Sequence, residues 1–254
     1  MNYEYRKLLA DTAILAGELM LTSGAETHRA ESTMNHILKK GTNATITTLA
    51  LTTSIMVTIE AEQGAPLTIV RRIFGSSIKL SRIVRVNEIS RNFCNDTITL
   101  EEAYQQLQQI PPREYSSRFY NIATIGIAVG FVMFFGGSFL DIVGSLCTSA
   151  VLAALITLCK RFHVGGFVLN CFSSAGLSLA CMILKNTLLP TIDTDIVIIG
   201  SIMSLVPGVA ITNAIRDTLQ GDYLSGCARI LEAFLTASAI AIGVGFGMLL
   251  FQLF

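Results

Sequence analysis

Charged residues divide the chain at Arg118. Residues 1–118 contain 13 of the 18 Lys and Arg residues and 12 of the 18 Asp and Glu residues, whereas residues 119–254 contain only 5 and 6. Over the whole chain 52% of the residues are hydrophobic and 14% are charged, compared with about 25% charged in an average soluble domain. This pattern predicts a soluble N-terminal half joined to a membrane-embedded C-terminal half. It argues against most soluble enzymes and favours transport.

The overall balance of the chain excludes several other classes. The formal net charge is +0, so we expect no binding to nucleic acid. The six cysteines do not pair at metal or redox spacing, and we expect them to be reduced apolar residues. Asp11 and Glu18 interrupt the apolar stretch Leu8–Met20, so it does not form a signal peptide. The N-terminal half is therefore expected to remain in the cytoplasm, with no cofactor.

Five apolar stretches in the second half approach the length of about 20 residues that a membrane-spanning helix needs. They are Phe119–Phe139, Ile142–Leu158, Val164–Leu184, Ile196–Thr212 and Ala228–Phe251. The sequence therefore predicts an α-helical membrane protein with five transmembrane helices. We expect a cytoplasmic domain over residues 1–113 and a membrane domain over residues 114–254.

The orientation follows from the distribution of basic residues near the ends of these stretches. The basic residues on one side are Arg113, Arg118, Lys160, Arg161, Arg216 and Arg229, whereas the other side has only Lys185. Because basic residues concentrate on the cytoplasmic side, the N-terminus should be inside and the C-terminus outside. An odd number of spans agrees with this orientation.

Two glycine pairs at helical spacing lie in the apolar stretches. They are Gly126 with Gly130, and Gly243 with Gly247. Small residues allow helices to approach closely in lipid, either within one chain or between subunits. The last stretch also contains Gly245, and it is the strongest candidate for contact with another chain.

The first half has the alternating helix and strand patterns of a small α+β domain. Ile55, Val57 and Ile59 alternate with polar residues, as in a strand with one buried face. The predicted order is helices over residues 4–20 and 26–39, strands within 45–62 and 67–73, then helices over 77–92 and from Thr99 onward.

A metal site in this half is not expected. Glu26, His28, Glu31 and His36 offer suitable ligand types. However, His28 and His36 are two helical turns apart, which is too far for the pair that binds zinc at i and i+4. A solvated helix face is the better interpretation. A hydrolase is a weaker hypothesis, because the hydroxyl residues have no base at a recognisable spacing.

The most informative segment is Leu205–Glu232. Pro207 and Gly208 lie inside an apolar stretch, where proline removes a backbone donor and clashes with the preceding turn. The fourth helix should therefore bend or break there. Transporters use broken helices of this kind to form substrate sites.

Polar residues follow this predicted break. Thr212, Asn213 and Arg216 are expected to share one helical face, on which Arg216 could bind a carboxylate. Asp217 could neutralise Arg216 or carry a coupling proton. Asp222 continues the polar segment. An Arg–Asp pair with a purely structural role is an equally strong interpretation.

Asp141 is the other prominent charge in the apolar half. It lies in a tight hairpin beside Gly136 and Gly137. One interpretation is a solvated residue at the membrane surface. The other is a proton-coupling residue, if the hairpin enters the membrane.

Three segments together resemble a known family. They read SGAETHRAE near the N-terminus, TLEEAYQQL before the apolar half, and PGVAITNAIRDTLQGDYLSGCARILEAFL near the end. They are similar to the threonine/serine exporter family, and more narrowly to the YjjP-like half of its split members. The third motif is the most specific of the three.

The resemblance implies a secondary transporter in the bacterial inner membrane that exports threonine and serine, or dicarboxylates such as succinate. Full-length members have about twice as many spans in one chain, so the resemblance implies a YjjB-like small membrane subunit as partner. The functional region that it implies contains Pro207, Gly208, Thr212, Asn213, Arg216, Asp217, Gly221 and Asp222. It also implies a cytoplasmic gate or assembly surface at Ser23, Gly24, Glu26 and Arg29.

The resulting hypothesis is a subunit of a proton-driven exporter of small hydrophilic carboxylates, embedded in membrane lipid. Arg216 would bind the substrate carboxylate, and Asp217 or Asp141 would couple protons. An accessory subunit, with transport performed by the partner, is the main alternative. A homo-oligomer is also expected, because five spans are few for a closed pathway.

Overall fold

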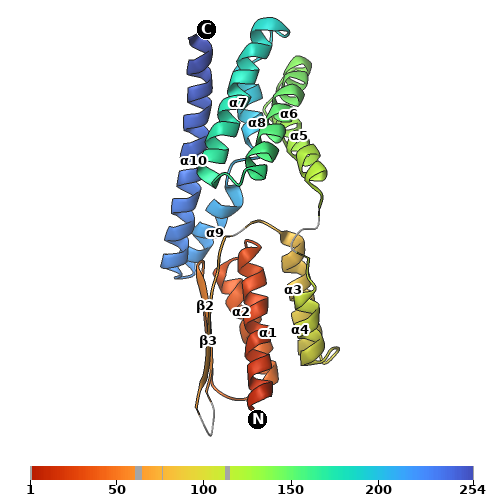
Figure 1. Ribbon diagram of the computed structural model, residues 1–254, viewed down its shortest axis with the longest axis vertical. Helices are drawn as coiled ribbons and strands as arrows, with labels where there is room; N and C mark the ends of the chain where they lie inside the picture. The colour runs from red at the N-terminus through yellow and green to blue at the C-terminus, as the bar shows by residue number, and fades with distance from the viewer. Residues whose placement is uncertain (1, 61–64, 76, 112–114, 254) are drawn as a thin grey trace. The chain divides into compact units, whose positions relative to one another are not determined.

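The computed structural model describes residues 2–60, 65–75, 77–111 and 115–253 (Figure 1). These residues form two compact units. Unit 1 contains Met1–Pro112 and Val209–Leu231, and unit 2 contains Arg113–Gly208 and Glu232–Phe254. The expected domain boundary between residues 113 and 114 lies outside the described residues. Residues 209–231, which follow that boundary in the sequence, are grouped with unit 1.

Unit 1 consists of helices and one antiparallel sheet. In chain order its elements are α1 (Tyr3–Thr22), α2 (Thr27–Gly41), β1 (Ile46–Leu51), β2 (Ser54–Ile59), β3 (Leu67–Arg72), α3 (Leu80–Cys94) and α4 (Leu100–Gln108). Helix α9 (Gly208–Leu219) and the start of α10 (Tyr223–Gln252) complete it. The sheet, the pair α1–α2 and the pair α3–α4 form three successive layers (Figure 1).

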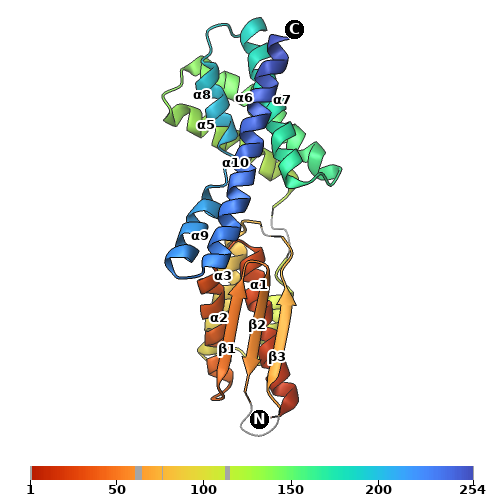
Figure 2. The same ribbon diagram turned by 90° about the vertical axis from the view of Figure 1, so that its left-hand side faces the viewer.

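The sheet has the strand order β1-β2-β3, with β2 in the centre. Figure 2 shows the three strands side by side, with α1 and α2 behind them. In β2, the side chains of Ile55, Val57 and Ile59 are each 1% exposed or less. This confirms the predicted alternation of buried and less buried residues along the strand. The strand-rich region 45–62 forms two strands rather than one, because the chain turns at Thr52 and Thr53.

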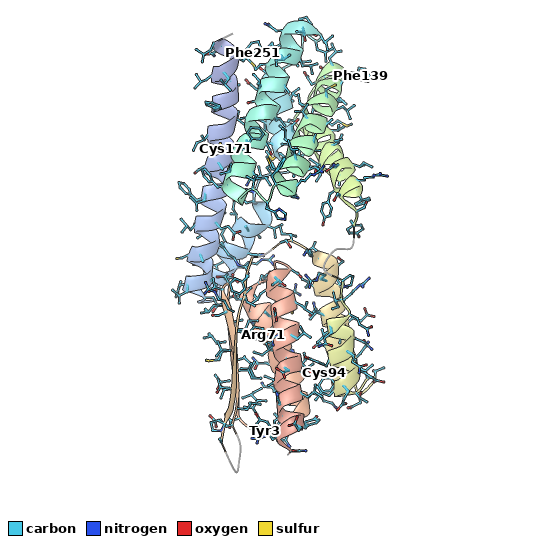
Figure 3. All side chains as sticks on the ribbon, in the orientation of Figure 1. Tyr3, Arg71, Cys94, Phe139, Cys171 and Phe251 are labelled. Atoms are coloured by element: carbon cyan, nitrogen blue, oxygen red, sulfur yellow. The ribbon has the colours of Figure 1, made fainter. Side chains whose placement is uncertain are left out.

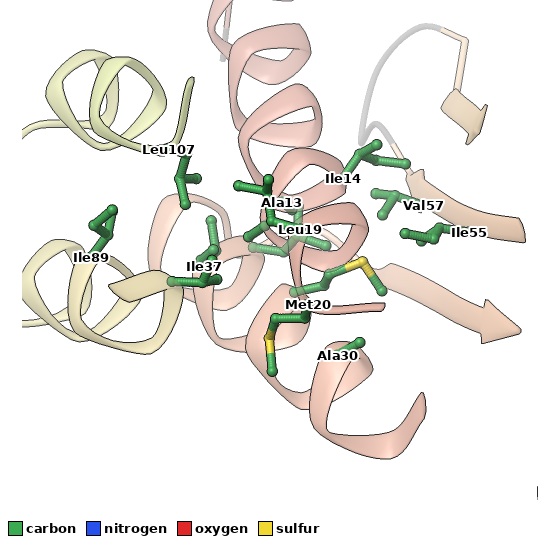
Figure 4. Close-up of a cluster of buried hydrophobic side chains, with 14 of the residues drawn as sticks. Ala13, Ile14, Leu19, Met20, Ala30, Ile37, Ile55, Val57, Ile89 and Leu107 are labelled. Carbon is green, nitrogen blue, oxygen red and sulfur yellow. The ribbon is translucent and has the colours of Figure 1, made fainter. Parts of the chain in front are cut away.

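Helix α1 is the centre of the unit 1 core. Ile14 lies beside Val57 of the sheet, and Leu107 of α4 approaches α1 near Ala13 (Figure 4). Both sides of α1 are therefore buried, which explains why its apolar residues do not form a single narrow stripe. A Cβ on Gly17 would lie 2.6 Å from Sδ of Met34, so a larger residue there would require the Met34 side chain of α2 to move.

Unit 2 contains α5 (Ser117–Phe134), α6 (Phe139–Arg161), α7 (Gly166–Thr187), α8 (Thr194–Ile202) and the remainder of α10. Within the described residues, four helices are long and apolar enough to cross a membrane, namely α5, α6, α7 and α10.

The fourth predicted span is not a continuous helix. Helix α8 stops at Ile202, and α9 begins only at Gly208. The predicted break is thus confirmed, and it lies on the N-terminal side of Pro207. With 9 residues, α8 is about 14 Å long, which is less than half of the hydrocarbon core of about 30 Å.

The two glycine pairs have different surroundings. A Cβ on Gly243 would collide with Cys171 and Ser174 of α7, and a Cβ on Gly247 would collide with Ala175 and Ser178. The hydroxyl of Ser178 also donates to the carbonyl of Val244 at 3.1 Å. The glycine pair of the last helix therefore packs against α7 of the same chain. Gly126 and Gly130 of α5, by contrast, have open space where their Cβ atoms would be.

Candidate functional site

The turn between α1 and α2 places four consecutive residues, Gly24–Thr27, at the ends of two helices. Gly24 has a φ of +80°, a left-handed conformation that glycine adopts without strain. The carbonyls of Gly24 and Ala25 lie between the two helices, so neither accepts a bond from α1, and the first N–H groups of α2 have no partner within their own helix. Glu26, the N-cap residue of α2, makes no side-chain capping bond. These groups therefore need partners from elsewhere in unit 1.

Residues of α9 and of the start of α10 supply these partners. The amide of Asn213 donates to the carbonyl of Gly24 at 2.9 Å. Nη2 of Arg229 donates to the carbonyl of Ala25 at 2.6 Å. Two successive backbone carbonyls are thus bound by side chains that lie about 190 and 200 residues later in the sequence. We call the set Gly24–Thr27, Asn213, Arg216, Asp217, Asp222 and Arg229 the 24–27 network.

Thr27 joins two carboxylates in this network. Its N–H and its hydroxyl both donate to Oδ1 of Asp217, at 3.2 and 2.9 Å. The hydroxyl oxygen is also 2.9 Å from Oδ2 of Asp222. Asp217 therefore caps the N-terminus of α2, where a negative charge is favoured by the helix dipole. Because a hydroxyl has one hydrogen, Thr27 can donate to only one of the two carboxylates at a time.

Two ion pairs complete the network, and they differ in burial. Arg216 Nη1 lies 2.6 Å from Oε1 of Glu26, with 57% of the Arg216 side chain and 11% of the Glu26 side chain exposed. Arg229 Nε lies 3.1 Å from Oδ2 of Asp217, with 11% and 0% exposed. The second pair lies within ion-pair distance without the alignment of a hydrogen bond. Both side chains of this second pair are buried, whereas the guanidinium of Arg216 in the first pair is exposed to solvent.

The structure brings together five of the predicted residues, namely Glu26, Asn213, Arg216, Asp217 and Asp222. Others lie elsewhere. Thr212 is on the exposed side of α9, and Arg29 is on the exposed side of α2. Pro207 and Gly208 mark the break before α9.

Two predicted relationships are wrong. Asn213 shares the buried face of α9 with Asp217, one turn later, rather than with Thr212 and Arg216. Asp217 also does not neutralise the adjacent Arg216, because it pairs with Arg229, and Arg216 pairs with Glu26. Successive residues on a helix point in directions about 100° apart, so neighbours in sequence face different partners.

Sequence reasoning missed three parts of the network. Thr27 lies inside the SGAETHRAE motif, but the contacts of its N–H and hydroxyl with Asp217 depend on a distant part of the chain. In the sequence Arg229 is a basic residue near a span, with no sign that it binds the carbonyl of Ala25 or pairs with Asp217. The carbonyls of Gly24 and Ala25 carry no side-chain signal at all, apart from the glycine that shapes the turn.

Asp141 belongs to unit 2 and has a different environment. It is only 4% exposed, so the interpretation as a solvated residue is wrong. Its Oδ2 accepts from the N–H of Ser138 at 2.7 Å, and its Oδ1 accepts from the N–H of Asp193 at 2.7 Å. Asp141 and Ser138 also form a capping box at the start of α6. Both carboxylate oxygens thus hold backbone groups in place.

Comparison with known proteins agrees with these motifs. A family model described as "Putative threonine/serine exporter" matches residues 11–251. A protein of Mycobacterium tuberculosis named "Probable threonine/serine exporter" is 24% identical over 242 residues, which cover 94% of this chain and 45% of that protein. The chain thus spans about half the length of that relative. No solved structure matches it. The family match covers nearly all of the chain, including both segments of the 24–27 network, and the chain therefore belongs to the threonine/serine exporter family.

Proposed function

We propose that this chain is a subunit of a proton-coupled secondary exporter of small hydrophilic carboxylates, with threonine and serine as the expected substrates. Family membership supports export as the activity. The 24–27 network supports a location for the substrate carboxylate. In this proposal the network is the cytoplasmic entry of the transport pathway, in a multi-pass protein of the bacterial inner membrane.

The observation that carries the proposal is the contact between Arg216 and Glu26. The guanidinium of Arg216 is more than half exposed, yet it is held by one carboxylate at 2.6 Å. A substrate carboxylate offers the same two oxygens as the Glu26 side chain, so it can take the place of Glu26 on the planar guanidinium. The guanidinium side of this pair is open to solvent, so a substrate carboxylate can reach it, and Glu26, whose side chain is 11% exposed, would give up its partner.

Asp217 is the stronger candidate for the coupling proton. Asp217 is fully buried, beside Arg229 and one hydroxyl away from Asp222. A proton arriving there would weaken the pairing with Arg229 and release the start of α2. Asp141 is the weaker candidate, because both of its oxygens already accept backbone N–H groups.

The proposed topology retains an N-terminus in the cytoplasm and a C-terminus outside. Helices α5, α6, α7 and α10 would provide four crossings. The fourth crossing in chain order would consist of α8 and the non-helical residues 203–207. Broken helices at membrane depth persist where protein or water satisfies the freed backbone groups.

A second chain is part of the proposal. The proposed partner is a YjjB-like small membrane subunit, which would contribute further spans; this chain matches 45% of the Mycobacterium tuberculosis relative. A homo-oligomer is the alternative arrangement. A dicarboxylate of the succinate type is the alternative substrate class, and an accessory subunit without transport activity is the alternative role.

The test is efflux from cells preloaded with labelled threonine, serine or succinate. The chain alone, the chain with a YjjB-like partner, and the partner alone are compared. We expect efflux of threonine or serine only from the pair. Efflux from the partner alone would mean that this chain has only an accessory role. Efflux of succinate without threonine or serine would mean that the substrates are dicarboxylates.

The role of Arg216 is tested in the same assay. Arg216→Ala should abolish efflux while the protein still reaches the membrane at normal levels. The matched control is Arg71→Ala, because Arg71 also forms a partly exposed ion pair in unit 1, with Glu18 at 2.9 Å. Normal efflux by the Arg216 variant, or equal loss in both variants, would contradict the assignment.

A further inference from the structure

A polar groove of about 420 Å³ lies in unit 1 between α2 and α3. Its lining includes His28, Arg29 and His36 of α2, and Asn87, Arg91 and Cys94 of α3. Its volume falls within the range of sites for small molecules, about 300–1,000 Å³. None of the contacts of the 24–27 network described above involves these side chains. The groove is therefore a separate feature of the unit.

The described side chains that line the groove are basic or neutral, and none of them is acidic. Two arginines and two histidines face the groove, and the remaining lining residues are hydroxyl, amide and thiol side chains. No Asp or Glu occurs among the described residues that line it. A groove that offers hydrogen-bond donors and positive charge without a carboxylate is complementary to an anion.

Cys94 does not alter this balance. The residue lies near the end of α3 (Figure 3), and its Sγ is 3.6 Å from the carbonyl oxygen of His36. Burial raises the pKa of the Cys94 thiol above its usual value. The thiol therefore stays neutral at physiological pH and acts as a weak donor rather than as a negative charge.

The helical spacing explains how these residues meet. His28, Ser32 and His36 recur every four residues along one face of α2, and Asn87, Arg91 and Cys94 recur along one face of α3. The sequence alone suggested a solvated face on α2, because it gave no indication that α3 packs beside it. In the structure the two faces are opposed across the groove.

We propose that the α2–α3 groove binds a small, multiply charged oxyanion, either a phosphate group or a compound with several carboxylates. Arg29 and Arg91 would form the charged hydrogen bonds, because the planar guanidinium matches both oxyanions. His28 and His36 would add ring N–H donors. The groove also adjoins the 24–27 network along the chain, because Thr27, which binds Asp217, immediately precedes His28. An anion in the groove would therefore act on the first turn of α2.

The test uses the purified full chain in detergent, titrated with inorganic phosphate or with citrate at constant ionic strength, against sodium chloride as reference. We expect a saturable rise in melting temperature with phosphate or with citrate. Saturation by phosphate alone identifies a phosphate site, and saturation by citrate alone identifies a carboxylate site. A rise no larger than that caused by chloride overturns the proposal.

Two variants localise the binding. Arg91→Gln and Arg29→Gln should each weaken binding of the titrated anion about tenfold, which is the loss expected for one charged hydrogen-bond pair. Lys39→Gln is the matched control, because Lys39 is an exposed cation of the same helix outside the lining. Equal affinities in all three variants would place the anion elsewhere.

A measurement on the unmodified chain covers the case in which the variants fail to fold. Alkylation of each cysteine is followed by peptide mass spectrometry, with and without the anion. The anion should slow the modification of Cys94 and leave the exposed Cys227 unchanged. Equal rates at Cys94 with and without a saturating anion would overturn the site. Neither readout depends on transport, so this proposal can fail while the exporter proposal stands, or the reverse.

Discussion

Arg216 and Glu26 form an ion pair of 2.6 Å, although 190 residues separate them in the sequence. Next to Arg216 in the chain, Asp217 forms a second pair with Arg229, and this pair is almost completely buried. Arg216 and Asp217 are adjacent in the sequence, yet they belong to two ion pairs that differ in how far their side chains are exposed. The pair of Asp217 and Arg229 holds the turn at residues 24–27 in place, whereas the pair of Arg216 and Glu26 leaves its guanidinium open to solvent.

Exchanging the charges of the exposed pair separates its structural role from a role in substrate binding. Glu26→Arg and Arg216→Glu should each lower the stability, because each places like charges together. The loss should be up to about 1 kcal/mol at the exposed Arg216 and larger at Glu26, whose side chain is only 11% exposed. The double variant should recover the stability, since the pair is restored with reversed polarity. It should not recover efflux, because the residue at position 216 would then repel a carboxylate. Melting temperature and efflux are measured on all four proteins, and recovery of efflux in the double variant would make the pair purely structural.

Removing the charge of Asp217 should be far more costly than removing an exposed charge. Asp217→Asn leaves the buried guanidinium of Arg229 without its counter-charge, which should lower the free energy of unfolding by about 3 kcal/mol. Asp96→Asn is the matched control, because Asp96 is paired with Lys40 but 77% exposed, and it should cost less than about 1 kcal/mol. Denaturation of both variants in detergent checks this. Equal costs would mean that the buried pair contributes no more than a surface pair.

The glycines of α10 should differ in their tolerance of a single methyl group. Gly247→Ala brings Cβ against Ser178 and the backbone of Ala175 in α7, whereas Gly245→Ala places it in open space. The first change should destabilise unit 2 by roughly 1–3 kcal/mol through overpacking. The second should be close to neutral. Size-exclusion chromatography and melting temperature measure the difference, and a larger loss for Gly245→Ala would point to a contact of that face with another chain.

Glu31 should give the stability a pH dependence of its own. Burial raises the pKa of the Glu31 carboxyl, and the N–H of Ala50, which donates to it at 2.7 Å, opposes this shift. The folded protein therefore holds this proton more tightly than the unfolded chain. The resulting stabilisation is complete below the ordinary glutamate pKa of about 4.3 and is lost as the pH rises through the raised pKa.

Glu31→Gln should consequently raise the melting temperature at pH 7 relative to the unmodified chain, since the amide oxygen can still accept from Ala50. The advantage should shrink toward pH 4. Glu60→Gln, at an exposed position, is the control. A lower melting temperature for Glu31→Gln at pH 7 would mean that the charge itself is stabilising, for example through His28.

Local patterns in the sequence were sufficient for several elements. The alternation of Ile55, Val57 and Ile59 predicted a strand with one buried face, because side chains of a strand point to opposite faces in turn. Pro207 predicted the helix break, because proline cannot donate to the preceding turn. Both signals act within a few residues, so no knowledge of the remaining chain was needed.

The partners in the network depend on distant parts of the chain, and local patterns did not reveal them. Nothing near Arg216 indicates that its partner is Glu26 rather than Asp217. The short length of α8 was also hidden, because Met203, Leu205 and Val206 continue the apolar stretch after the helix has ended. Hydropathy reports that a segment avoids water, and it does not report whether the segment is helical.

The separation of 190 residues between Glu26 and Arg216 also has a consequence for biosynthesis. At about 5–20 residues per second, ribosomes need roughly 10–40 s to proceed from the first residue to the second. During that interval the turn at residues 24–27 exists without its partners, while α5, α6 and α7 are synthesised. The network can close only after these apolar helices have left the ribosome. Closure of the network therefore marks a late stage of maturation. A chain whose insertion has stalled would keep an open turn at residues 24–27, and quality-control proteases could recognise it by that turn.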